Sequence, residues 1–239
     1  MLRLDSMNGQ YKVYHGERFV GSLRLYENPC HLKNCYVHLA LERPDADISA
    51  ELFHTLAEIT GRPLQVMVSS ADTSLIAFLI AGGFQCRRKC YEVNASRADY
   101  AGGRPAVPLS HCFAGEADYE AACQTMFAHY VSVHEAINPW TADDTVFRGH
   151  LPAEAVLARE DGVLSAVAFV EGNEIAYVWG ADERFFADFA QRLVTELFSR
   201  YETLCFESDD GDWAAMRLRS LFKNPGETRV DTYVYPGVD

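Results

Sequence analysis

The sequence lacks any long apolar run. Its longest apolar stretches, such as LIAFLIAGGF at residues 75–84, fall well short of the roughly 18 residues that a membrane-spanning helix needs. The first residues, MLRLDSMNGQ, also lack the apolar block of a secretory signal peptide. Both absences predict a cytoplasmic protein with no membrane partner, and in that compartment its seven cysteines would stay reduced.

Basic residues are scarce. Lys and Arg total 21 against 34 Asp and Glu, which gives a formal net charge of −13. Nucleic-acid binding depends on clustered Lys and Arg that neutralise phosphates, so this balance argues against a nucleic-acid partner. The basic cluster CRRKC at residues 86–90 is interpreted as a solvated strand edge whose charges discourage further strand pairing.

Tight cysteine pairs and nucleotide-binding glycine loops are missing as well. Cys30 and Cys35 are five positions apart, and Cys86 and Cys90 are four apart, whereas zinc knuckles use Cys-x-x-Cys. Strand alternation would place Cys35 and His38 on opposite faces. We therefore expect no metal site, and no nucleotide-binding glycine loop of the usual types is present.

The sequence does contain an element pattern that occurs twice. Hydrophobic spacing and turn residues predict hairpin, strand, helix, strand, helix and strand in both halves of the chain. Asp72 and Asp212, which are 140 positions apart, each precede the second helix of this pattern, as N-cap residues do. The repeat indicates an internal duplication, with domains at residues 1–95 and 109–239 joined by a linker at residues 96–108.

Two local patterns make specific predictions. Asp161–Gly162, between two β-rich segments, predicts a tight hairpin turn. In the first half, four apolar residues repeat at helical spacing and predict the buried face of a helix. They are Leu52, Phe53, Leu56 and Ile59.

The stretch DTSLIAFLIAGGF carries a resemblance to a known family. Asp72, Leu75–Ile76 and Gly83–Phe84 follow the spacing of a motif that commonly reads Asn-x-x-Ala-Ile-x-x-Tyr-x-x-x-Gly-Phe. This motif belongs to the C-terminal part of GNAT-superfamily N-acetyltransferases, which the chain therefore resembles. The motif consists largely of common apolar residues and is of moderate specificity.

The second half matches the same motif at Asp212 and Ala215–Met216 and departs from it at Lys223–Asn224. The resemblance thus covers both halves. It implies an α/β (α+β) protein of two GNAT-like acyl-CoA N-acyltransferase domains, each a mixed, mostly antiparallel sheet flanked by helices. The first domain is expected to be truncated, without the opening strand and the two helices of a full domain, and the second to be fuller.

The resemblance implies acetyl-CoA as the acyl donor and no metal. In this family the pantetheine arm of the donor enters where two central strands separate, which is expected at residues 37–41 with 64–68 and at 175–179 with 203–206. Exposed backbone groups there would bind the pantetheine amides. The two halves are expected to pack against each other within one chain, with a homodimer as a further arrangement.

The second half is expected to bind the donor. The diphosphate loop of the family, Arg/Gln-x-x-Gly-x-Gly/Ala, presents backbone N–H groups at a helix N-terminus. Here Asp188 stands where the first glycine is expected, Ala190 conforms to the pattern, and Arg184 lies one position from the expected Arg. The residues that the resemblance assigns to the cofactor are Val178, Trp179, Gly180, Arg184, Phe189, Ala190 and Asp212.

The Tyr that many family members use as general acid is missing. Leu79 and Arg219 occupy its position in the two halves, and neither can protonate a departing thiolate at neutral pH. In this family a Glu on the fourth strand often serves as general base, directly or through water, so the resemblance implies Glu174 as the base. Tyr177 is the candidate for the general acid. Each also fits a structural role, Glu174 as a solvated charge at a strand end and Tyr177 as a packed strand residue.

The acceptor site is expected in the aromatic loop after the first helix of the second half, because in this family the loop between the first two helices covers the acceptor. The residues assigned to substrate binding are His134, Glu135, Asn138 and Trp140. The alternative is a helix end with Asn-Pro turn chemistry, in which Trp140 packs onto the sheet.

The predicted function is transfer of an acetyl or acyl group from acyl-CoA to an amine of a small molecule or peptide. The neutral amine would attack the thioester carbonyl, which a backbone N–H near Val178 would polarise. The alternative is a catalytically inactive GNAT-like protein that binds a ligand or a partner without turnover. The missing glycines and the missing Tyr favour this alternative, whereas the complete element order of the second half favours the enzyme.

Overall fold

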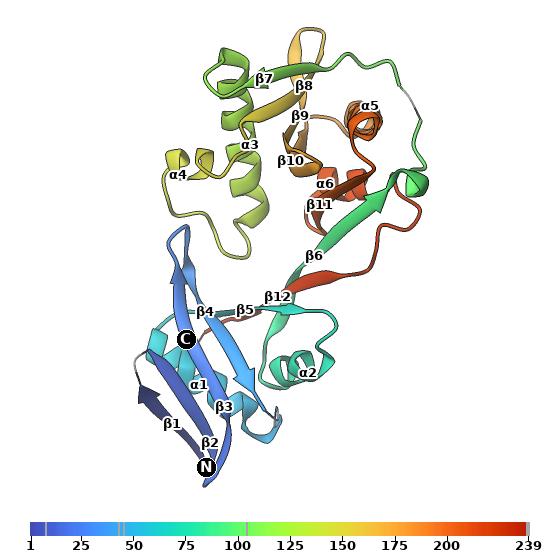
Figure 1. Ribbon diagram of the computed structural model, residues 1–239. Coiled ribbons are helices and arrows are strands. Elements are labelled where there is room, and N and C mark those ends of the chain that lie inside the picture. The colour runs from blue at the N-terminus through green and yellow to red at the C-terminus, as the bar shows by residue number, and fades with distance from the viewer. Residues whose placement is uncertain (8, 43, 45, 104, 238–239) are drawn as a thin grey trace. The chain divides into compact units, whose positions relative to one another are not determined.

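The computed structural model describes residues 1–7, 9–42, 44, 46–103 and 105–237 (Figure 1). Contacts between residues divide the chain into two units. Unit 1 contains Met1–Lys89, His134–Ala142 and Val230–Asp239, and unit 2 contains Cys90–Val133 and Asp143–Arg229.

Unit 1 is a mixed sheet with two helices. Its strands are β1 (Leu2–Met7), β2 (Gln10–His15), β3 (Arg18–Asn28), β4 (His31–Leu41), β5 (Leu64–Ser69) and β12 (Arg229–Tyr235). Its helices are α1 (Ala46–Thr60) and α2 (Thr73–Ala81). The strand order is β1-β2-β3-β4-β5-β12. All neighbours are antiparallel except β4 and β5, which are parallel.

The apolar side of α1 forms much of the core of unit 1. Leu52, Phe53 and Leu56 are fully buried, which confirms the helical spacing read from the sequence. Ile59 shares that spacing but is 50% exposed. Ile59 is the second-last residue of α1, which ends at Thr60, so the core covers this position less completely than Leu52, Phe53 and Leu56.

Unit 2 contains strands of mixed pairing together with helices. Its strands are β6 (Gln85–Ser96), of which the residues from Cys90 onward belong to this unit, β7 (Ser110–Phe113), β8 (Glu154–Glu160), β9 (Val163–Glu171), β10 (Glu174–Gly180) and β11 (Thr203–Asp209). Its helices are α3 (Ala117–His134), α4 (Asp144–Arg148), α5 (Glu183–Arg200) and α6 (Trp213–Arg219), with a short 3₁₀ turn at Arg97–Asp99. The strand order is β6-β11-β10-β9-β8-β7. Only β10 and β11 are parallel neighbours.

The core of unit 2 forms under α5. Phe186, Phe189 and Leu193 of this helix are at most 1% exposed and belong to one apolar cluster with residues of β9, β10 and β11. At the β8–β9 connection both turn residues have positive φ, 51° at Asp161 and 82° at Gly162. This is the backbone of a tight hairpin turn, and it confirms the prediction for this dipeptide.

The last strand of each half of the sequence pairs with a strand of the other half. β6, at the end of the first half, pairs with β11, and β12, at the end of the second half, pairs with β5. β6 follows α2 in the chain, but seven of its residues pair with β11, from Ser96↔Thr203 to Cys90↔Asp209. β12 follows α6 but pairs with β5, from Tyr235↔Leu64 to Val230↔Ser69. The units therefore differ from the contiguous segments 1–95 and 109–239 expected from the sequence, because hydrophobic patterns define a strand but not its partner.

The element order nevertheless repeats as the sequence predicted. Each half contains a hairpin, a strand, a helix, a strand, a helix and a strand. Asp72 accepts a hydrogen bond from Leu75 N at 3.0 Å and Asp212 accepts one from Ala214 N at 2.9 Å, so both cap their helices. The expectation that the first half lacks an opening strand is wrong, because β1 pairs antiparallel with β2. No helix lies between them, since only residues 8 and 9 separate the two strands.

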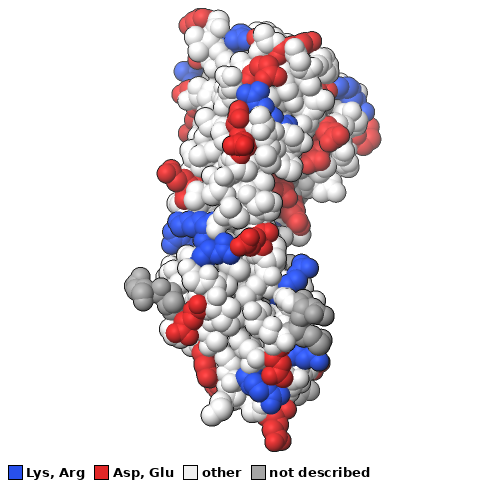
Figure 2. All heavy atoms as spheres, turned by 90° about the vertical axis from the view of Figure 1, so that its left-hand side faces the viewer, with Lys and Arg blue, Asp and Glu red and all other residues white. Residues whose placement is uncertain are grey.

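Charges are interspersed on the face of the molecule in Figure 2, where acidic and basic side chains occur in small groups and neither sign forms a continuous tract. Among the described residues, no helix combines the length and the apolar character needed to cross a lipid bilayer.

Candidate active site

The parallel strands β10 and β11 of unit 2 pair over a short distance and then separate. Their pairing consists of Glu174↔Cys205 and Ile175↔Phe206. On the other edge of β10, the register with β9 shifts between Ile175 and Tyr177, which is typical of a β-bulge. The remaining residues of β10 therefore leave β11, as the sequence predicted for this strand pair.

The equivalent strands of unit 1 show the same feature. β4 and β5 pair at Cys35↔Leu64 and Tyr36↔Gln65, although β4 continues to Leu41 and β5 to Ser69. Both halves thus contain a pair of parallel strands that are joined at one end and open at the other.

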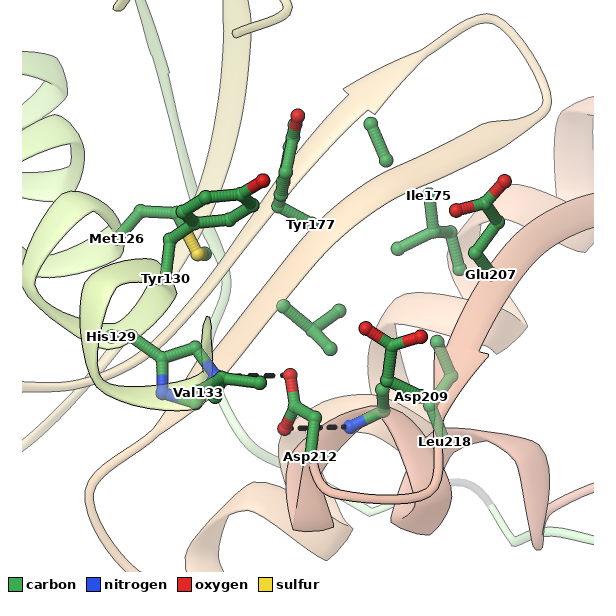
Figure 3. Close-up of a pocket in the computed structure, with 13 residues that line it drawn as sticks. Met126, His129, Tyr130, Val133, Ile175, Tyr177, Glu207, Asp209, Asp212 and Leu218 are labelled. Carbon is green, nitrogen blue, oxygen red and sulfur yellow. Dashed lines mark hydrogen bonds and ion pairs between the residues drawn. The ribbon is translucent and has the colours of Figure 1, made fainter. Parts of the chain in front are cut away.

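A pocket with a volume of about 100 Å³ lies at the opening in unit 2. Its walls come from α3, β10, β11 and α6 (Figure 3). Tyr177, Val178 and Asp212, three of the residues assigned from the sequence, line this pocket. His129 and Tyr130 of α3, which the sequence analysis did not single out, line it as well.

The spacing on α3 explains why these two residues reach the pocket. Met126, His129, Tyr130 and Val133 line it together, and their positions i, i+3, i+4 and i+7 define one face of a helix. A polar residue within such a stripe is a sequence signal that could have identified His129.

His129 and Asp212 form a hydrogen bond in the pocket (Figure 3). The distance between His129 Nε2 and Asp212 Oδ2 is 3.0 Å, and the two side chains are only 13% and 15% exposed. The other carboxylate oxygen of Asp212 accepts the backbone N–H groups of Ala214 at 2.9 Å and Ala215 at 3.3 Å. Asp212 is therefore fixed by α6 and in turn orients the imidazole.

Tyr177 lies on the aromatic wall of the pocket. Its ring centroid is 5.8 Å from that of Phe147 and 6.4 Å from that of Tyr130. Burial of the Tyr177 hydroxyl, together with the negative charges of Glu207 and Glu174, raises its pKa above the ordinary value of 10. The hydroxyl therefore stays protonated at neutral pH, as a proton donor requires.

Glu174 lies apart from these residues. It lines a neighbouring pocket of about 320 Å³ with Glu92, Cys205 and Glu207, among others. Glu207 lines both pockets. The structure thus brings Tyr177, Val178 and Asp212 together at the first pocket and places Glu174 at the neighbouring one.

The N-terminus of α5 differs from a glycine loop. Asp182 caps this helix and accepts a hydrogen bond from Phe185 N at 2.9 Å, while Ala181 N donates to Ser165 O. Two of the backbone N–H groups near this helix start are thus already satisfied, and a carboxylate stands beside them. Arg184 is exposed in the first turn of α5.

The remaining cofactor assignments from the sequence lie in two environments. Trp179 and Gly180 end β10 and pair with Val167 and Ala166 of β9. Phe189 and Ala190 are 0% and 1% exposed in the core beneath α5, so their side chains face other apolar residues and not the pocket.

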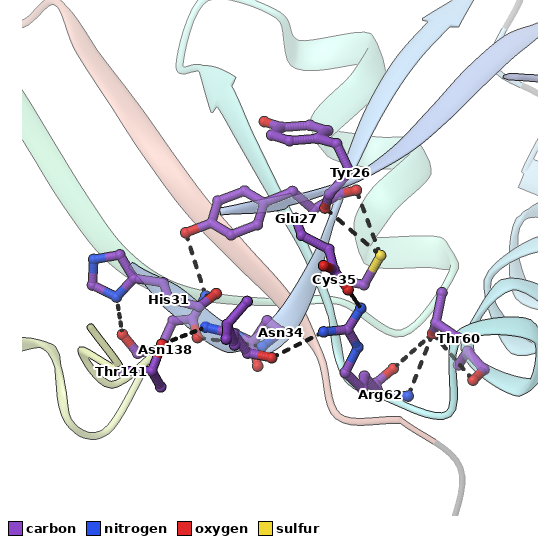
Figure 4. A network of polar contacts seen from close by, with 12 residues as sticks. Tyr26, Glu27, His31, Asn34, Cys35, Thr60, Arg62, Asn138 and Thr141 are labelled. Carbon is purple, nitrogen blue, oxygen red and sulfur yellow. Dashed lines mark hydrogen bonds and ion pairs between the residues drawn. The ribbon is translucent and has the colours of Figure 1, made fainter. Parts of the chain in front are cut away.

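The four residues assigned to the acceptor belong to unit 1, and none of them lines the pocket between β10 and β11. The loop after α3 binds strands β4 and β5 instead (Figure 4). His31 Nδ1 lies 2.7 Å from Asn138 O, and Trp140 packs edge-on against the His31 ring. His134 Nε2 lies 2.7 Å from Arg88 Nη1, and Glu135 is exposed.

Asn138 is the centre of this contact. Its amide oxygen accepts Asn34 N at 3.3 Å, and its amide nitrogen donates to Tyr36 Oη at 3.3 Å and Gln65 Oε1 at 3.2 Å. Asn138 is only 3% exposed. A buried amide with this many partners anchors the loop. Among the described residues of the whole chain, no group of three or more His, Cys, Asp or Glu side chains is arranged to hold a metal ion.

Solved structures with this arrangement of elements include several acetyltransferases. A GCN5-related N-acetyltransferase from Sphaerobacter thermophilus matches 99% of this chain and 84% of its own, with 12% identity and a TM-score of 0.52. A tandem GNAT protein from the clavulanic acid biosynthesis pathway matches 100% of this chain and 84% of its own, with 18% identity and a TM-score of 0.53.

The chain has a GNAT-superfamily fold. A GCN5-related N-acetyltransferase from Kribbella flavida agrees with this, since it matches 99% of this chain and 90% of its own at 15% identity and a TM-score of 0.52. At such identities the similarity concerns the fold alone. No protein-family model and no curated protein sequence matches the chain. The GNAT fold with two GNAT-like halves confirms the fold class expected from the sequence.

Proposed function

We propose that unit 2 binds an acyl-CoA between β10 and β11 and transfers the acyl group to an amine. The observation that carries this proposal is the separation of the two strands after Ile175 and Phe206, at the mouth of the pocket that Tyr177, Val178 and Asp212 line. A strand that leaves its neighbour exposes backbone amide groups that can bind an extended ligand, and a pantetheine arm is such a ligand.

The donor would lie along the end of β10. The backbones of Val178, Trp179 and Gly180 would bind the pantetheine amides, and an N–H near Val178 would polarise the thioester carbonyl. Asp212 would border the arm at the start of α6. Arg184 would approach the diphosphate from the first turn of α5, where a cation and the helix N-terminus both attract phosphate.

Tyr177 and Glu174 would divide the proton transfers. The hydroxyl of Tyr177 is protonated at neutral pH because its pKa is raised, so it can protonate the departing thiolate. Glu174 lines the neighbouring pocket, so it would accept the proton of the amine through water. The hydrogen bond between His129 and Asp212 gives the pocket a fixed polar surface.

A second candidate is a GNAT-like protein that binds a ligand without turnover. The observation that favours it is the cap of α5, because the Asp182 carboxylate binds Phe185 N close to where the diphosphate would lie. A carboxylate about 4 Å from a phosphate charge costs on the order of 4 kcal/mol at an effective dielectric of 20. The two candidates differ in whether CoA is released from acyl-CoA in the presence of an amine.

Thermal unfolding with acetyl-CoA, CoA and desulfo-CoA tests donor binding. We expect each ligand to raise the Tm, since a ligand at a hundredfold excess over its Kd stabilises the native state by about 2.7 kcal/mol. Arg184→Glu should remove most of the shift. Arg192→Glu, which makes the same charge change two turns further along α5, should keep it.

Three outcomes would contradict all or part of this proposal. No shift with any of the three ligands would exclude acyl-CoA binding. A shift that Arg184→Glu and Arg192→Glu reduce equally would place the diphosphate elsewhere. A shift without CoA release from acetyl-CoA, measured with a thiol reagent over a panel of primary amines, would select the protein without turnover.

A further inference from the structure

The charge of the pocket in unit 2 has one dominant sign. Glu207, Asp209 and Asp212 supply three carboxylates, and His129 is the one group among the lining residues that can carry a positive charge. No Lys or Arg belongs to the described lining. The carboxylates come from β11 and from the turn that leads into α6 (Figure 3). Clefts lined by one sign of charge concentrate ligands of the opposite sign.

The three carboxylates are not equivalent. Asp212 is occupied by His129 and by two backbone N–H groups of α6. Glu207 is exposed, and its described hydrogen bond is a contact of 3.6 Å from the Cys90 thiol. A thiol is a weak donor, so the negative charge of Glu207 is not neutralised by this contact.

Aromatic rings face these carboxylates across the pocket. Tyr130 and Tyr177 lie side by side on the wall opposite Glu207 and Asp209 (Figure 3). The pKa of Tyr177 is raised mainly by burial, and the negative charges of Glu207 and Glu174 add to this effect. Carboxylates and aromatic faces both attract an ammonium group, and a carboxylate-bearing ligand would meet repulsion from several directions.

We propose that the acceptor is an aliphatic amine with at least two ammonium groups and no carboxylate. One nitrogen reacts, while the second stays protonated and binds at Glu207 and Asp209. This inference rests on the proposed function, because it names the acceptor class of the same pocket.

Atoms and charges are conserved in this acyl transfer. The reacting ammonium first releases one proton to solvent. Its nitrogen then forms a bond to the acyl carbon while the carbon–sulfur bond of the thioester breaks. The second proton lost by this nitrogen is balanced by the proton that the CoA thiolate takes up. The products are the monoacylated amine, which keeps its other ammonium, and free CoA.

A series of matched amines tests the proposal. 1,4-Diaminobutane, n-butylamine and 4-aminobutanoate have the same carbon chain and end in an ammonium, a methyl and a carboxylate group. With acetyl-CoA at saturation we expect kcat/KM to be highest for the diamine and lowest for 4-aminobutanoate. The preference should weaken as salt is added, because exposed charges are screened.

Matched variants test the assignment of Glu207. Glu207→Gln should raise the KM for the diamine by about 5-fold, as expected for loss of a partly exposed ion pair, and raise the KM for n-butylamine by a clearly smaller factor. Glu92→Gln is the control, because Glu92 is exposed, pairs with Glu207 across β6 and β11, and does not line this pocket. This control should retain the preference.

The acceptor class and the acyl-transfer activity can fail independently of each other. Equal or better use of n-butylamine or 4-aminobutanoate, in a protein that binds and turns over acetyl-CoA, would overturn the acceptor class alone. If no amine is acetylated, titration calorimetry measures whether the protein binds the diamine more tightly than n-butylamine. Binding of the diamine that Glu207→Gln weakens would support the site, and equal binding of the diamine and n-butylamine would overturn it.

Discussion

The seven cysteines are all present as thiols, but their surroundings differ widely. Cys112 of β7 is 3% exposed, and burial together with the nearby Asp118 and Glu116 raises its pKa to about 11. Cys86 of β6 is exposed. Because the thiolate is the reactive form, the chemical behaviour of these residues depends on local environment and not on their number in the sequence.

The rate of alkylation should distinguish Cys86 from Cys112. We expect iodoacetamide at pH 8 to label Cys86 well before Cys112, since only about one in a thousand Cys112 thiols would be ionised at that pH. Mass spectrometry of peptides taken at successive times measures both rates. In a denaturant the two rates should converge, and labelling of native Cys112 as fast as Cys86 would contradict the environment described for it.

At the scale of elements, the loop after α3 has a structural role that its aromatic and polar composition does not reveal. Asn138 satisfies the backbone N–H of Asn34 and the side chains of Tyr36 and Gln65. All four residues are at most 6% exposed. The loop is therefore held by buried polar groups from β4 and β5.

Asn138→Ala should destabilise the protein by about 1–3 kcal/mol, because it leaves a buried backbone donor without a partner. Urea unfolding followed by circular dichroism measures the change. Asn173→Ala is the control, since its side chain makes an exposed contact with Thr203 O and should change stability by less than about 0.5 kcal/mol. A similar loss for both variants would argue against a special role for Asn138.

The sequence predicted the secondary-structure elements well and the residues of the pocket only in part, because the first depend on local contacts and the second on distant ones. Asp72, Asp161–Gly162 and Asp212 act on their own neighbours in the chain, so local spacing was enough to assign the helix caps and the hairpin turn. His129 and Asp212 are 83 positions apart, and no local pattern predicts that contact.

At the scale of the whole molecule, β6 and β12 are exchanged between the two halves of the sequence. A repeat of elements does not by itself require such an exchange. Each half ends in a strand that completes the sheet of the other unit. A sheet without its neighbouring strand exposes unpaired backbone groups, which favours aggregation or pairing with another chain. Neither half of the duplicated sequence therefore contains all the strands of one unit.

Chain cleavage within the linker tests this dependence. We expect fragments 1–102 and 103–239 to associate when produced together, and to aggregate when produced separately. Co-purification through a tag on one fragment, followed by size-exclusion chromatography, measures the association. A folded monomer of fragment 1–102 alone, with β6 paired to its own β5, would show that the exchange is not required.

The partner of β5 also determines when unit 1 can be completed during synthesis. β5 ends at Ser69 and its neighbour β12 begins at Arg229, so about 160 residues are translated between them. At ribosomal speeds of about 5–20 residues per second, β5 waits roughly 8–32 s for that neighbour. The part of the chain made first is thus finished last, and its nascent form is a natural client for chaperones that shield open strands.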